Sequence, residues 1–261
     1  MKRLALAVTA LAVLTLAGYI TGFPADTAQS LLRDIEIVKR ELPVDLIELF
    51  VLTPLPGSED HRNMVLRSEW MDADLNKFNA DHRVTHHPRM SDREWDEAYL
   101  RAWDSYYSSG HIEIVARRRA VLPNGRVARV VAFMTIFRLL QSVERVHPLE
   151  GGLVRLKYRR DRRPGLPIEL PVVFHLKLVA AFAGKLVSYG RLGFLGWRIA
   201  RRVLGDPTRS TYSDTAIAPV DESDLDRLEM FSATMGAEVA VARKRDEDRR
   251  RAQVAMRSAA E

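Results

Sequence analysis

Residues 18–27, GYITGFPADT, and residues 44–58, VDLIELFVLTPLPGS, decide the fold that we expect for this chain. The second stretch holds a nearly continuous apolar run from Leu46 to Leu52, which is typical of a buried parallel strand, and two prolines and a glycine end it. Between the two stretches, apolar residues recur at helical spacing behind an expected N-cap at Asp26. Strand, helix and strand in this order predict a parallel βαβ unit with a right-handed crossover.

The segment before Gly18 is similar to the front of an exported protein. A basic pair, an apolar run from Leu4 to Leu16 and the small residue Ala17 match the three regions of a secretory signal in order. The run is shorter than the roughly 20 apolar residues of a transmembrane span, unless it continues past Gly18. Residues 1–17 are therefore either a signal or anchor, or a leader-like segment that adjoins the first strand.

Residues 61–220 are predicted to be a mainly helical extension, and residues 221–261 a charged C-terminal helix. Ser91 and Glu94 have the spacing of a capping box, and they open a helix with aromatic residues along one face. These aromatic residues are Trp95, Tyr99, Trp103 and Tyr106. Such a stripe is usually core packing, so we expect it to be buried.

The polar region from residue 61 to residue 89 raises the question of a metal site. It contains His61, Asp72, Asp74, Asp81, His82, His86 and His87. His82 and His86 have i, i+4 spacing, but Pro88 and the weak periodicity favour a loop, and no HExxH motif is present. We therefore predict loop histidines and no metal site. No nucleophile elbow, P-loop or dinucleotide fingerprint is present, so no catalytic residue is predicted.

The charge of the chain favours anionic partners, because the formal net charge is +6. The loop of residues 155–163 is strongly basic, and a solvated loop and an anion site both fit it. Residues 172–189 and 190–204 are read as two apolar helices with basic flanks, which either lie on a membrane surface or pack on the domain. Lysines interrupt the apolar run, so no span is predicted. A nucleic-acid partner would rest on charge alone and is not predicted.

The two opening stretches together resemble the fifth and sixth strands of the partial (βα)6 barrel of radical S-adenosylmethionine enzymes, especially those with a cobalamin-binding domain in front. In that family the fifth strand commonly reads G-x-I-x-G-F-P-x-[ED]-T, and the sixth ends in T-P-x-P-G-[ST]. The matching residues are Gly18, Ile20, Gly22, Phe23, Pro24, Asp26, Thr27, Thr53, Pro54, Pro56, Gly57 and Ser58. The resemblance implies an α/β fold, in which residues 18–60 are the last two strands of a partial (βα)6 TIM-like barrel, the C-terminal fragment of that barrel, followed by the mainly helical extension.

The resemblance also implies a site for S-adenosylmethionine. The cofactor-binding residues that it implies are Gly18, Ile20, Gly22, Leu52, Thr53 and Pro54. The first three would touch the adenine side of the cofactor, and the backbone of the last three would close the pocket. The physical chemistry agrees, since glycines at the carboxyl end of a strand let a flat ligand approach and Ile20 offers an apolar surface.

The chain departs from the family at the metal centre. Family members hold a four-iron four-sulfur (4Fe-4S) cluster through three cysteines, and this chain contains no cysteine and starts at the fifth strand. We therefore expect a cytoplasmic chain that contributes the adenine side of the site and is not catalytically competent alone. A separate chain would carry the cluster-binding half. Truncation, a frameshift or a misplaced start would each produce such a chain.

The alternative is a small basic protein of non-enzymatic role that is exported or associated with a membrane through its N-terminal apolar segment. Cleavage after Ala17 would favour this alternative, and an intact cytosolic chain would favour the first hypothesis.

Overall fold

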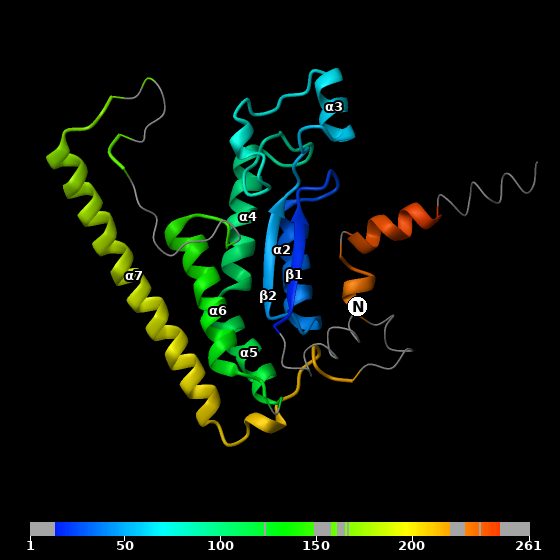
Figure 1. Cartoon of the computed structure of the whole chain (residues 1–261). Helices are drawn as coiled ribbons and strands as arrows, with labels where there is room; N and C mark the ends of the chain where they lie inside the picture. The colour runs from blue at the N-terminus through cyan, green and yellow to red at the C-terminus, as the bar shows by residue number, and fades with distance from the viewer. Residues whose placement is uncertain are drawn as a thin grey trace, which may run out of the picture. The chain divides into compact units, whose positions relative to one another are not determined.

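A computed structural model of the chain describes residues 14–122, 124–148, 158–160, 165, 167–219, 228–234 and 236–245 (Figure 1). The chain divides into two compact units. The first unit contains Thr15–Tyr106 and the described residues from Ser213 onward, and the second contains Tyr107–Tyr212. The leader-like segment lies outside the described residues up to position 13, and Leu16 and Ala17 already belong to the first strand.

The first unit is built on a strand, a helix and a strand. β1 (Leu16–Thr21) and β2 (Leu46–Val51) pair in parallel, and α2 (Ala28–Glu41) connects them. α2 buries Leu31 and Ile35, one helical turn apart, so its apolar face lies toward the core. The parallel pairing brings the carboxyl ends of both strands to the same edge of the sheet.

α4 (Asp92–Tyr106) packs against α2 and along β2. The expected capping box is confirmed, because the Ser91 N–H donates to the Glu94 carboxylate at 2.8 Å and the Glu94 N–H donates to the Ser91 hydroxyl at 3.3 Å. The aromatic stripe of α4 is buried, as expected. The Tyr106 hydroxyl donates to the carbonyl of Val44 at 3.0 Å, which ties the end of α4 to the start of β2.

The expectation of a TIM-like barrel fragment is wrong. The structure is mostly helical and contains a two-stranded parallel sheet. At the outer edge of β2, the Val51 N–H donates to the carbonyl of Ala80 at 2.7 Å, and the Tyr99 hydroxyl is 3.0 Å from the carbonyl oxygen of Leu49. These groups occupy the outer edge of β2, so in the described part of the chain no strand follows β2 in the sheet.

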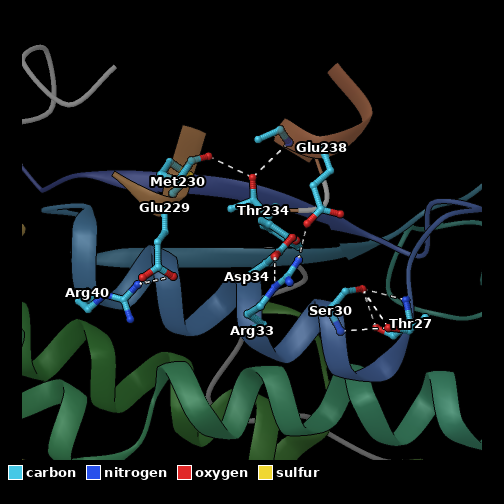
Figure 2. Close-up of polar contacts among 11 residues, drawn as sticks. Thr27, Ser30, Arg33, Asp34, Arg40, Glu229, Met230, Thr234 and Glu238 are labelled. Atoms are coloured by element: carbon cyan, nitrogen blue, oxygen red, sulfur yellow. Dashed lines mark hydrogen bonds and ion pairs between the residues drawn. The ribbon is translucent and has the colours of Figure 1, made fainter. Parts of the chain in front are cut away.

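The C-terminal part of the first unit returns to α2 (Figure 2). η6 (Glu229–Phe231) begins where the Glu41 carboxylate accepts the N–H groups of Glu229 and Met230 at 3.1 and 2.8 Å. A helix over residues 236–245 follows, and its Glu238 pairs with Arg33 of α2 at 3.3 Å. Residues 221–227, 235 and 246–261 of the expected C-terminal helix lie outside the described residues.

The second unit consists of helices that pack on one another: α5 (Ser109–Ala120), α6 (Val127–Leu139) and α7 (Pro171–Gly205). α6 continues into a π-helical turn, η2 (Leu140–Glu144), and η4 (Arg209–Thr211) follows α7. α7 is one continuous helix, where two helices were expected. Its internal glycines lower helix propensity by about 1 kcal/mol each, which does not interrupt a helix of 35 residues.

Between β2 and α4 the chain forms α3 (Glu59–Leu66), η1 (Leu75–Lys77) and an ordered loop that an antiparallel bridge from Met71 to Thr85 closes. This segment covers the carboxyl ends of the strands and forms part of the site described next. The basic loop of residues 155–163 lies outside the described residues except for positions 158–160.

Candidate functional site

A cleft of about 840 Å³ opens at the carboxyl ends of β1 and β2. Its walls come from the turn after β1 (22–24), the turn after β2 (52–54), α3 with the residues that follow it (60–70), the loop 85–88, and Trp95 of α4. All of these segments belong to the first unit. Ligands of α/β proteins bind at this end of parallel strands, so the cleft is the candidate functional site.

The turn after β1 is held in one shape by its own motif residues. Gly22 has a φ of +93°, and a Cβ at this position would lie 2.0 Å from the Trp95 ring, so the position requires glycine. The Asp26 carboxylate accepts the N–H groups of Gly22 and Phe23 at 2.8 and 2.9 Å. Burial raises the pKa of the Asp26 carboxyl, although these two N–H groups act in the opposite direction.

The sequence pattern suggested Asp26 as the N-cap of α2, but the N-cap in the structure is Thr27. The Thr27 hydroxyl accepts the Ser30 N–H at 3.1 Å, and the Ser30 hydroxyl accepts the Thr27 N–H at 2.9 Å. This reciprocal box leaves Asp26 available for the preceding turn. Asp26 and Thr27 of the F-P-A-D-T part of the motif therefore each have a structural role, Asp26 in the turn and Thr27 as the N-cap.

The loop 85–88 is fastened to the same turn through His87. Its Nδ1 accepts the Arg89 N–H at 3.0 Å, so the ring proton sits on Nε2, which donates to the Phe23 carbonyl at 2.9 Å. The His87 ring also meets Trp95 edge-on, with centroids 5.2 Å apart. Two walls of the cleft thus hold each other in place before any ligand arrives.

The open rim of the cleft carries an aromatic pair. The rings of Trp70 and His86 stack with centroids 4.3 Å apart, and His86 Nδ1 lies 2.9 Å from the Asp92 carboxylate. Trp70 is 47% exposed, so a part of its surface remains open to a planar ligand. The polar groups of the rim come from α3 and from the residues after it: Asp60, Asn63, Arg67 and Glu69.

Four of the six cofactor-binding residues that the resemblance implied line this cleft: Gly22, Leu52, Thr53 and Pro54. Gly18 and Ile20 lie earlier on β1, outside the cleft. Both residues lie on the same face of the sheet, because side chains alternate along a strand and residues two apart share a face. On that face Ile20 is 46% exposed, and a Cβ at Gly18 would lie 3.3 Å from the Phe50 ring. Gly22 lies past the end of β1, so this alternation does not apply to it.

Sequence reasoning did not identify the outer wall of the cleft. Trp70, Asn63 and Arg67 lie in a polar region without a sustained period, and His86 was considered only as a metal ligand. The signal that could have found them is their position, because a segment that directly follows the second of two parallel strands starts at the edge where both strands have their carboxyl ends.

The histidines do not converge on a common point. His61 meets Phe78 edge-on, His82 lies 2.9 Å from the Asn79 side chain, and the other two make the contacts given above. Among the described residues, no group of three histidine, aspartate or glutamate side chains is arranged to hold a metal ion. The donor set also does not fit a 4Fe-4S cluster, because the whole sequence contains no cysteine.

No protein-family model matches this chain, and neither a curated protein nor a solved structure matches it. The functional inference therefore depends on the cleft and on the two sequence motifs that form its inner wall.

Proposed function

We propose that this chain binds the adenosyl part of S-adenosylmethionine in the cleft at the carboxyl ends of β1 and β2. One observation carries the proposal. Gly22 and residues 52–54 come from two separate motifs, both of which resemble cofactor-binding strands of radical S-adenosylmethionine proteins, and they line one cavity.

The chemistry of the walls suits this ligand. The cavity of about 840 Å³ lies in the range of small-molecule sites. Phe23, Leu52 and Met64 provide apolar surface for a purine, and the exposed ring of Trp70 offers a stacking surface. Asp60 and Asn63 present the carboxylate and amide groups that hydrogen-bond ribose hydroxyls.

Binding in this cleft would not by itself give radical chemistry. The cluster that cleaves S-adenosylmethionine in radical enzymes needs thiolate ligands, and this chain has none. We therefore propose that a separate chain supplies the cluster and that the present chain contributes the adenine side of a shared site. Anaerobic reconstitution with iron and sulfide tests this part: a stoichiometric four-iron cluster on this chain alone would contradict it.

Calorimetric titration with S-adenosylmethionine tests the binding site. We expect saturable binding to the wild-type chain, and adenosine should compete for it. Trp70→Ala removes the stacking surface and should weaken binding about tenfold, which corresponds to about 1.4 kcal/mol. Trp197→Ala is the matched control, because Trp197 is similarly exposed, at 52% against 47% for Trp70, and lies in the second unit. Absence of saturable binding to the folded chain, or an equal loss in both variants, would overturn the proposal.

A second candidate function, association with a membrane in a non-enzymatic role, rests on a different observation. α7 exposes much of its apolar surface, as described below. Cell fractionation tests the association: the chain in the membrane fraction would support it, and the chain in the soluble fraction alone would contradict it. The mass of the mature N-terminus tests export separately, because cleavage after Ala17 supports export and an intact chain contradicts export.

A further inference from the structure

α7 exposes a row of large apolar side chains. The row, called the outward stripe here, consists of Val172, Leu176, Val179, Leu186, Phe194 and Trp197, and its members are between 52% and 70% exposed. Their spacing of three, four, seven or eight residues places them on one face of the helix. The helix is about 52 Å long at 1.5 Å per residue, so the outward stripe extends over most of its length.

Only the C-terminal part of α7 is buried in the second unit. Gly196, Ile199 and Val203 lie on the opposite side of the helix and are buried. A Cβ at Gly196 would lie 2.6 Å from the Thr135 hydroxyl oxygen, which shows how closely α6 approaches there. In Figure 1, α7 diverges from α6 toward its N-terminal end. Lys185 and Tyr189, in the middle of α7, bond to Glu144 of η2. The unit therefore holds the middle and the C-terminal end of α7 and leaves the outward stripe uncovered.

The charges of α7 are all of one sign. Residues 171–205 contain six lysines and arginines and no aspartate or glutamate. Two of the cations flank the aromatic end of the outward stripe: Arg198 lies over the Phe194 ring at 5.9 Å, and Arg201 lies over the Trp197 ring at 5.2 Å. A cation beside an aromatic ring at the boundary of an apolar face is the arrangement that amphipathic helices use at lipid headgroups.

We propose that α7 binds the surface of an anionic lipid bilayer, with the outward stripe inserted at the boundary of headgroups and acyl chains and the flanking cations on lipid phosphates. Exposed apolar area supplies one part of the affinity, and the attraction between the cations and anionic headgroups supplies the other. This inference is independent of the cleft.

Two alternatives to a membrane surface, a second copy of α7 and a transmembrane orientation, fit the charges of α7 less well. A second copy of α7 would place cationic helices against each other without a carboxylate on either one. A transmembrane orientation also has to be considered, because among the described residues α7 is long and apolar enough to cross a bilayer by length and composition. However, the longest part of α7 without lysine or arginine is residues 178–184, so a span would bury at least two cations in hydrocarbon.

Co-sedimentation of the full chain with lipid vesicles tests the proposal. We expect binding to vesicles of phosphatidylcholine mixed with phosphatidylserine, weaker binding to pure phosphatidylcholine, and a loss of binding at high salt. Leu176→Glu should weaken the binding at least tenfold. Leu75→Glu is the matched control, since both leucines are 66% exposed and Leu75 lies in η1 of the first unit. Binding through the apolar segment of residues 4–16 would be equal in both variants.

Tryptophan quenching by brominated lipids locates the contact. We expect quenching in the wild-type chain and its loss in Trp197→Phe, while circular dichroism checks that each variant is folded. Four results would overturn the proposal: no binding to anionic vesicles, an equal loss in both leucine variants, resistance of bound protein to alkaline extraction, which indicates a span, or a lipid-free dimer that Leu176→Glu dissociates.

Discussion

α4 and α7 carry the same kind of sequence pattern, and the structure treats them in opposite ways. Both helices repeat large apolar residues at intervals of three and four. Trp95, Tyr99 and Trp103 of α4 are buried, whereas Leu176 and Trp197 of α7 are more than half exposed. Periodicity therefore identifies an apolar face but does not indicate what covers that face.

The neighbours of each helix explain the difference. α4 lies against α2 and β2, and it belongs to a strand–helix–strand unit whose apolar faces need a cover. α7 is buried only near its C-terminal end, and its charges repeat along its whole length. The stripe of α4 therefore supports the inner wall of the cleft through Trp95, and the outward stripe of α7 remains exposed.

The largest expected effect comes from truncating a side chain in the buried aromatic stripe of α4. Trp103→Ala should lower the free energy of unfolding by about 3–5 kcal/mol, because it removes a fully buried ring and leaves a cavity. Phe194→Ala, which shortens an exposed ring in the outward stripe, should change it by no more than about 0.5 kcal/mol. Urea unfolding of both variants gives the two values. Comparable losses would show that α7 is covered in solution, and the contrast between the helices would fail.

An intermediate effect is expected where the stripe of α4 meets the turn after β1. Gly22→Ala should destabilise the chain by about 1–3 kcal/mol, because alanine would be strained at positive φ and its Cβ would collide with Trp95. Gly57→Ala is the control for strain alone, since Gly57 has a φ of +92° and no atom within 4 Å of its built Cβ. Thermal unfolding compares the two. If Gly57→Ala cost as much, the contact between Gly22 and Trp95 would not matter.

The smallest expected effect is a pH dependence in the same turn. Burial raises the pKa of Asp26 in the folded chain, so the folded state holds a proton more tightly than the unfolded state. This contribution to stability is complete below the ordinary carboxyl pKa of about 3.9 and is lost as the pH rises through the raised folded pKa. Asp26→Asn keeps an acceptor oxygen and removes the titration. The stability of the wild-type chain relative to this variant should therefore fall as the pH rises through that window, as measured by urea unfolding across the acidic range. A relative stability that rises instead would mean that the Gly22 and Phe23 N–H groups outweigh burial.

Local patterns predicted the elements of the first unit well and their assembly poorly. The apolar run from Leu46, the turn residues after it and the helical spacing between the two motifs led to the strands and helix that the structure contains. The barrel fragment was wrong because the described residues are mostly helical around a two-stranded sheet, and the outer edge of β2 is occupied by the Ala80 carbonyl and the Tyr99 hydroxyl. Both groups come from segments far along the chain, and no local pattern reveals such contacts.

The site was predictable to the same extent. Gly22 and residues 52–54 directly follow the ends of the two strands, and the two sequence motifs predicted them as binding residues. Trp70 and His86 reach the cleft through a loop whose path depends on the bridge from Met71 to Thr85. The continuity of α7 was also missed, because the sequence was divided into residues 172–189 and 190–204, and the structure has no break between them.

Photoaffinity labelling with S-adenosylmethionine that carries an azide on its adenine shows where on the chain the cofactor binds. We expect that irradiation labels peptides from residues 52–70 and 85–95, the walls of the cleft, and that unmodified S-adenosylmethionine prevents the labelling. The absence of protected labelling, or protected labelling confined to peptides outside these walls, would contradict it.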